Sequence, residues 1–135
     1  MWSHLKKEPR ELSPLVLAYI GDAVYELYVR LSLVSRGNLK VKQLHKESIS
    51  LVNAGAQAGF LHRLESILTE EEKAIVRRGR NVKGTHVPKN ADVIDYRLST
   101  GFEALIGYLF LIGQEDRLQE IMHYLLNDHD DKNDH

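Results

Sequence analysis

Two carboxylates, Asp22 and Glu103, stand inside apolar segments that lie far apart in the chain. Asp22 belongs to the segment 15–24, which reads LVLAYIGDAV, and Glu103 belongs to the segment 100–107, which reads TGFEALIG. A charge inside such a segment is costly to bury unless it is paired or binds a metal ion. Each segment also has small residues beside the acid, and small residues let helices approach one another. We therefore predict that the two acids meet and share one metal ion.

The chemistry expected of such a pair is that of a hard divalent cation. Magnesium (Mg²⁺) prefers oxygen ligands, takes one or two protein carboxylates and keeps several waters. A cation held in this way cleaves phosphodiesters by activating water and stabilising charge on the leaving oxygen. Glu26 lies one helical turn beyond Asp22 and could hold a metal-bound water. The spacing leaves an alternative open, in which Asp22 and Glu103 pair with Lys or Arg on neighbouring helices.

A basic segment lies between the two acids. Residues 73–91 include six Lys and Arg and no Asp or Glu. Cations on a helix end and a glycine-containing loop can follow a phosphate backbone, and Arg, Lys, Thr and Asn suit the phosphates and 2′-hydroxyls of double-stranded RNA. The segment has no aromatic residue, which disfavours base stacking with single strands. The alternative is a solvated basic surface. The candidate RNA-binding residues are Arg77, Arg78, Arg80, Lys83, Thr85, His86 and Lys89.

The composition predicts one soluble globular domain. The chain has 135 residues, of which 43% are hydrophobic and 27% charged, so a packed core is within reach. Without cysteine, disulfides and thiolate zinc sites are excluded. No apolar run reaches membrane-spanning length, and the first residues lack the apolar core of a signal peptide, so we expect a cytoplasmic protein. The net charge of −1 argues against a uniformly basic nucleic-acid binder and requires any RNA contact to be a local patch.

The first helix is well marked. Ser13 is a good N-cap, Pro14 suits the first helical position, and Gly37 ends the element. Tyr19 either anchors a dimer contact or is a buried aromatic within one chain. The apolar positions recur with helical spacing at Leu15, Val16, Tyr19, Ile20, Ala23, Val24, Leu27 and Leu31.

Only helical patterns follow along the chain, so the predicted fold class is all-α. We expect a helical region over 40–68 with close packing or a break near Gly59, and a helix that Thr69 opens with a capping box and that ends near Gly79. A loop over 80–89, a long helix over 90–112 and a last helix over 115–127 come next. The predicted domain spans 1–127, and 128–135 is expected to be a disordered acidic tail.

The two acidic segments together resemble the catalytic domain of the ribonuclease III family. Residues 19–24 (YIGDAV) are similar to part of the signature helix of that family, and residues 100–107 are similar to its second metal-binding helix. The resemblance spans about 12–127. The chain resembles the bacterial branch of the family that has the catalytic domain alone, without a following domain that binds double-stranded RNA.

This resemblance implies a ribonuclease III-type helical bundle that forms a homodimer with two active sites along an RNA groove. It also implies Mg²⁺-dependent cleavage of double-stranded RNA, with Asp22 and Glu103 as catalytic metal ligands and with 5′-phosphate and 3′-hydroxyl ends as products. The expected substrate is the 23S ribosomal RNA precursor, trimmed near both ends, and a ribosomal protein could help to present it. Leu15, Ala18 and Thr100 stand where the family pattern has acids, which favours a water-rich metal site.

Two other functions remain open from the sequence. The first is a non-catalytic RNA-binding factor of ribosome assembly, which would keep the basic loop but have no working metal site. The second is a metal-dependent phosphohydrolase of small nucleotides, which would need histidine ligands near Asp22. His45, His62 and His123 show no metal-ligand spacing, which disfavours the second alternative.

Overall fold

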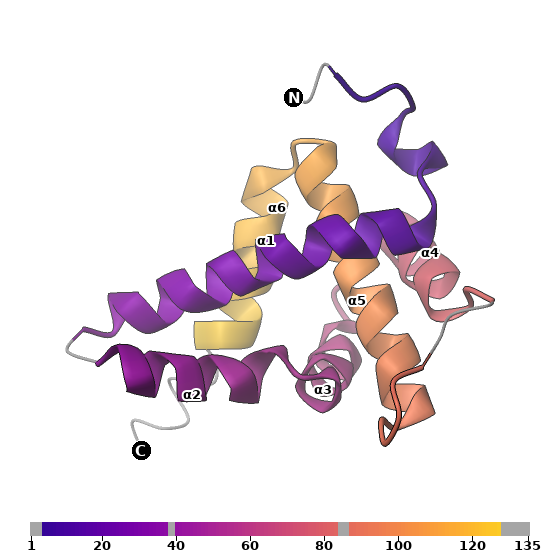
Figure 1. The fold of residues 1–135 in the computed structure, drawn as a ribbon. Coiled ribbons are helices and arrows are strands. Elements are labelled where there is room, and N and C mark those ends of the chain that lie inside the picture. The colour runs from indigo at the N-terminus through magenta and orange to yellow at the C-terminus, as the bar shows by residue number, and fades with distance from the viewer. Residues whose placement is uncertain (1–3, 38–39, 84–86, 128–135) are drawn as a thin grey trace.

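The computed structural model describes residues 4–37, 40–83 and 87–127. Over these ranges the chain forms six α-helices and no strand, so the all-α prediction is confirmed (Figure 1). The predicted tail at 128–135 and the candidate residues Thr85 and His86 lie outside the described residues. None of the described helices has the length and apolar character needed to cross a membrane.

Helix α1 (Pro14–Ser35) begins and ends as predicted. The Ser13 hydroxyl accepts a hydrogen bond from the backbone N–H of Val16 at 3.2 Å, and Gly37 follows the helix with a positive φ of 77°. The predicted apolar positions divide between two faces, however. The buried face consists of Leu17, Ala18, Gly21, Val24, Tyr25, Val29 and Leu33. Leu15, Val16, Tyr19, Leu27 and Leu31 are exposed instead.

Helices α2 (Val41–Val52) and α3 (Ala54–Leu64) replace the single region expected over 40–68. The break lies at Asn53, so the prediction of a break near Gly59 is wrong. The Asn53 carboxamide oxygen accepts from the N–H of Ala56 at 2.9 Å, while its nitrogen donates to the carbonyl of Ile49 at 3.0 Å. One side chain therefore caps both helix ends, and Gly59 is an ordinary residue inside α3.

The remaining helices are α4 (Glu70–Arg80), α5 (Val93–Leu111) and α6 (Glu115–Met122), which continues into a π-helical turn, His123–Asn127. The capping box of α4 is confirmed, because Thr69 and Glu72 exchange hydrogen bonds of 2.8 and 3.1 Å. Asp92 caps α5, so this helix starts a few residues later than predicted. Gly113, with a φ of 78°, follows its end as expected.

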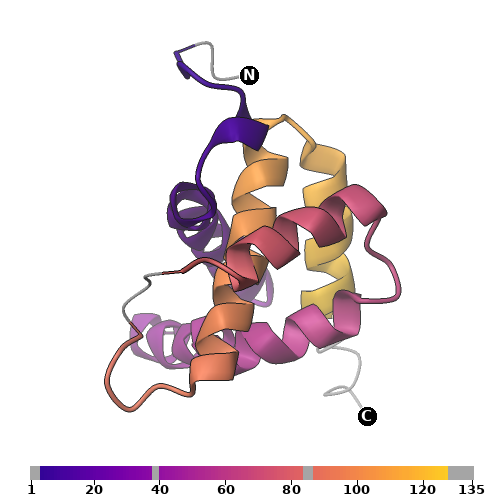
Figure 2. The same ribbon diagram turned by 90° about the vertical axis from the view of Figure 1, so that its right-hand side faces the viewer.

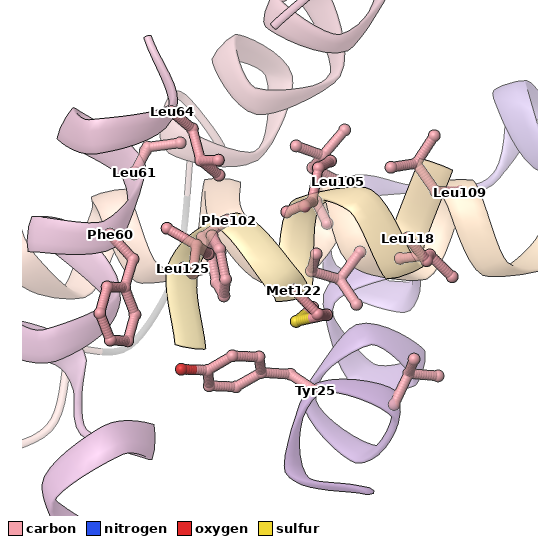
Figure 3. Close-up of a cluster of buried hydrophobic side chains, with 14 of the residues drawn as sticks. Tyr25, Phe60, Leu61, Leu64, Phe102, Leu105, Leu109, Leu118, Met122 and Leu125 are labelled. Atoms are coloured by element: carbon pink, nitrogen blue, oxygen red, sulfur yellow. The ribbon is translucent and has the colours of Figure 1, made fainter. Parts of the chain in front are cut away.

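Helix α5 is the centre of the fold. Helix α1 crosses it close to Gly107 (Figure 1), and α4 crosses it close to Gly101 (Figure 2). The core gathers around α5 from α1, α3 and α6, with Tyr25 edge-on to Phe102 at 5.0 Å between ring centroids (Figure 3). The Tyr25 hydroxyl donates to the carbonyl of Leu51 at 2.8 Å and so ties α1 to the end of α2. The elements that carry the two acids are therefore fixed by the largest part of the core.

Candidate active site

A close crossing of α1 and α5 brings the two acidic residues together. A Cβ atom added at Gly21 would lie 1.7 Å from the carbonyl oxygen of Glu103, and one added at Gly107 would lie 2.0 Å from the carbonyl oxygen of Leu17. Only glycine therefore fits at either position. Asp22 directly follows Gly21, and Glu103 stands one turn before Gly107, so both carboxylates belong to the crossing. The small residues beside the acids do allow the helices to approach, as predicted.

The Glu103 carboxyl is half-buried beside that of Asp22. Burial, followed by a hydrogen bond with Asp22 and charge repulsion from it, raises the pKa of Glu103 from its ordinary value of 4.5 to about 8. Glu26 adds a smaller repulsion, whereas the Gln57 amide lowers the pKa. Among the residues that the structure describes, no Lys or Arg forms an ion pair with Asp22 or Glu103. The described part of the chain therefore does not support the alternative in which Asp22 and Glu103 pair with Lys or Arg.

These carboxylates fit a hard divalent cation. Their donor atoms are all oxygen, and at neutral pH the pair needs either a shared proton or a cation to offset its charge. Within 4–37, 40–83 and 87–127, no three His, Asp or Glu side chains come together in a way that could hold a metal ion. A cation here would therefore have Asp22 and Glu103 as its acidic ligands and would keep much of its water shell. The roles of both residues as metal ligands remain predictions.

Gln57 is a residue of this site that sequence reasoning missed. Its side chain is 1% exposed, and its Nε2 donates to the carbonyl of Val52 at 3.0 Å and to Glu103 Oε2 at 3.5 Å. A usable signal was present in the sequence. Gln57 is a polar amide among the small residues 54–59, at a position that belongs to the buried side of α3. The same reasoning that singled out Asp22 and Glu103 applies to it.

Two of the predicted RNA-binding residues share one face of α4. Arg77 and Arg80 line a hollow of about 350 Å³ between α3, α4 and α5. Lys73 lines the same hollow and also pairs with Glu70 at 3.5 Å. Sequence reasoning did not select Lys73, although its spacing from Arg77 and Arg80 follows one helical face. The hollow therefore has three cations at its edge.

Arg78 points to a different neighbour. Its guanidinium donates to the carbonyl oxygens of Arg10 at 3.1 Å and Leu12 at 3.2 Å, and so holds the N-terminal 3-10 turn η1 (Pro9–Glu11) against α4. Lys83 and Lys89 are exposed on either side of 84–86. Contact of any of these residues with RNA remains a prediction, and for Arg78 it would require the present hydrogen bonds to be exchanged.

The carboxyl pair makes stability depend on pH when no metal is bound. Because the pKa of Glu103 is higher in the folded chain, its contribution is fully present below about pH 4.5 and is lost as the pH rises through 8. We expect the free energy of unfolding to fall by about 3 kcal/mol from this group between pH 5 and pH 8.5. Urea titrations in EDTA should show this fall in the parent chain but not in Glu103→Gln, and equal pH dependence in the two proteins would contradict the burial of the charge.

The chain is similar to known proteins of one family. The model of the Ribonuclease III domain family matches residues 15–114. The Mini-ribonuclease 3 of Symbiobacterium thermophilum is 54% identical over 114 residues, which cover 84% of this chain and 88% of the relative. That of a Thermoanaerobacter species is 55% identical over 111 residues, covering 82% and 78%.

A solved structure has a similar fold. The crystal structure of a Fusobacterium nucleatum protein is similar with a TM-score of 0.80 and 30% identity, and covers 92% of this chain and 99% of that one. The resemblance stated from the sequence is thereby confirmed, as is the expected class of enzyme, an endoribonuclease. The chain belongs to the ribonuclease III family and, within it, to the Mini-ribonuclease 3 proteins.

Proposed function

We propose that this chain is a Mg²⁺-dependent endoribonuclease that cleaves double-stranded RNA. The observation that carries the proposal is the meeting of Asp22 and Glu103 at the α1–α5 crossing, where no described Lys or Arg pairs with them. Asp22 and Glu103 would hold the ion, and Glu26 would orient a water of its hydration shell. When bound, the ion activates water for attack on the scissile phosphate and stabilises charge on the leaving oxygen.

The substrate we propose is the double-stranded part of the 23S ribosomal RNA precursor, cut near its 5′ and 3′ ends in the cytoplasm. Family membership supports double-stranded RNA as the class of substrate, and a ribosomal protein that presents the precursor is compatible with this proposal. Arg77 and Arg80 contact the phosphate backbone from α4, and Lys83 and Lys89 do so from the loop. Thr85 and His86, which lie outside the described residues, are proposed to contact sugars or base edges.

Incubation with duplex RNA tests the proposed reaction. We expect the chain to cut a structured ribosomal RNA precursor in Mg²⁺ and not in EDTA, and end mapping should find 5′-phosphate and 3′-hydroxyl termini. Magnesium-independent binding without any cleavage would contradict the proposal. That result would favour the alternative function, a non-catalytic RNA-binding factor of ribosome assembly.

The contact with RNA makes a separate prediction about salt. Replacing Arg77 and Arg80 together with Ala should lower the slope of log affinity against log salt by about 1 for each phosphate contact that is lost. Arg78→Ala is the matched comparison, because its guanidinium is held by the backbone of Arg10 and Leu12. It should lower thermal stability and change the slope by less than the double variant does, because a contact between Arg78 and RNA would have to replace these hydrogen bonds. An unchanged slope in the double variant, measured by filter binding, would remove the hollow from the RNA site.

We further propose that the chain forms a homodimer through the exposed apolar face of α1. Tyr19 is 79% exposed, and Leu27 and Leu31 are each 57% exposed. These residues and Ala23 follow one another at four-residue intervals, so they form one stripe along the helix. A two-fold axis beside the small Ala23 would pack the stripe against its own copy. Two sites related by this axis suit the two antiparallel strands of a duplex.

Tyr19→Glu tests the dimer, because a charge within a self-packed stripe is buried twice, once in each copy. We expect the variant to scatter light as a monomer at concentrations where the parent chain is a dimer. Ile94→Glu, at a 69% exposed position of α5, is the control and should remain a dimer. A parent chain that is fully active as a monomer would contradict the proposal.

A further inference from the structure

Gln57 connects the junction of α2 and α3 to the acidic pair. Val52 is the last residue of α2, and the break at Asn53 leaves its carbonyl without a partner in the helix. Gln57 Nε2 donates to this carbonyl at 3.0 Å and reaches Glu103 Oε2 at 3.5 Å. The side chain is 1% exposed, so packing as well as hydrogen bonding limits its movement.

The orientation of this amide is set by its neighbours. If the amide were turned over, its oxygen would face two acceptors, the carbonyl of Val52 and the Glu103 carboxylate. In the observed orientation, Gln57 Oε1 is the one buried side-chain polar atom in 4–37, 40–83 and 87–127 without a hydrogen-bond partner. Such an atom carries a desolvation cost. The two hydrogen bonds that Nε2 donates offset this cost.

We propose that Gln57 is a positioning residue, whose amide holds the Glu103 carboxylate beside Asp22 and thereby raises the affinity of the pair for a divalent ion. This inference rests on the proposed function, since it assumes that the pair binds such an ion. Groups that orient a metal ligand commonly contribute about 10- to 100-fold to metal affinity or activity. A purely structural Gln57 would instead contribute only to the α2–α3 junction.

Binding of Mn²⁺ to the full chain, followed by electron paramagnetic resonance without RNA, separates these two roles. Gln57→Met keeps the length of the side chain and removes both hydrogen bonds, so we expect the Kd for Mn²⁺ to rise about tenfold. Asn53→Ala is the matched control, because it weakens the same junction without touching Glu103. We expect its Kd to stay within about twofold of the parent value. A Kd for Gln57→Met close to that of the parent, or an equal loss in Asn53→Ala, would overturn the inference.

A measurement on the parent chain covers the case in which Gln57→Met does not fold. The side-chain amide resonance of Gln57 should shift as Mg²⁺ is added, saturate with the ion, and stay in place in Asp22→Asn. A resonance that does not move in the parent chain would contradict the inference. If the parent binds Mn²⁺ and cuts duplex RNA while Gln57→Met binds equally well, only the role of Gln57 fails. If the parent neither binds the ion nor cuts RNA, the proposed function fails as well.

Discussion

Replacing Asp22 with Asn should lower the rate of duplex cleavage on the order of a thousandfold, because the variant loses one of the two acidic ligands at the α1–α5 crossing. Binding of the duplex in EDTA should stay within about threefold of the parent, since Asp22 contacts the ion and not the phosphate backbone. Single-turnover cleavage and filter binding measure the two effects separately. Asp116→Asn, an exposed carboxylate of α6, is the control and should retain full activity.

A metal site shared by Asp22 and Glu103 also predicts the cleavage rate of the variant in which both residues are replaced. Residues that act as one unit are strongly non-additive, so Asp22→Asn combined with Glu103→Gln should cost about as much as either change alone. If the loss of cleavage rate in the double variant equals the product of the losses in the two single variants, the two carboxylates act separately. Full activity in Asp22→Asn would refute its role at the metal outright.

Replacing Gly21 with Ala should lower the free energy of unfolding by about 4 kcal/mol or more, which is a large part of the stability of a domain of this size. The added Cβ would lie 1.7 Å from the carbonyl oxygen of Glu103, so α1 and α5 must move apart. Gly59→Ala is the matched control, because no atom lies within 4 Å of the position that its Cβ would occupy. It should raise the stability of α3 by about 0.5–1 kcal/mol.

Urea denaturation of these two glycine variants measures the closeness of the crossing. A Gly21→Ala protein as stable as the parent would show that the helices do not touch there, and it would remove the reason for placing Asp22 beside Glu103. Activity is a second readout, because a variant that still folds would hold the two acids farther apart and should lose cleavage as well.

The helix boundaries that depend on local chemistry could be predicted from the sequence. Ser13, the Thr69 capping box and Gly113 each mark an end through hydrogen bonds or backbone angles within a few residues. The break at Asn53 was missed because Gly59 is the better helix breaker in isolation. Asn53 prevails because one carboxamide satisfies both helix ends, which only the folded geometry displays.

The face of α1 that packs against α5 could not be predicted, because this helix has apolar residues on two of its faces. Periodicity shows that a helix has an apolar face, but it does not tell which of two faces packs on α5. Gly21 determines which face packs, because only a glycine at this position permits the backbone contact with Glu103. The residues left outside, with Tyr19 among them, are the ones that we assign to the dimer.

The candidate site divides in a similar way. Asp22 and Glu103 could be found because an acid in an apolar helix needs a physical explanation, although the structure half-buries Glu103 and leaves Asp22 exposed. The engagement of Arg78 could not be found, because its partners Arg10 and Leu12 lie 68 and 66 positions away in the chain. Contacts between residues so far apart depend on the packed fold, and no local sequence pattern indicates them.

Diffraction from crystals soaked in Mn²⁺ tests the central claim most directly, because the anomalous signal locates the ion without reference to activity. We expect one ion at the α1–α5 crossing, about 2.0–2.5 Å from a carboxylate oxygen of Asp22 or Glu103 and in contact with the other acid directly or through one water. An ion bound elsewhere, with the two acids too far apart to share it even through its water shell, would contradict the account.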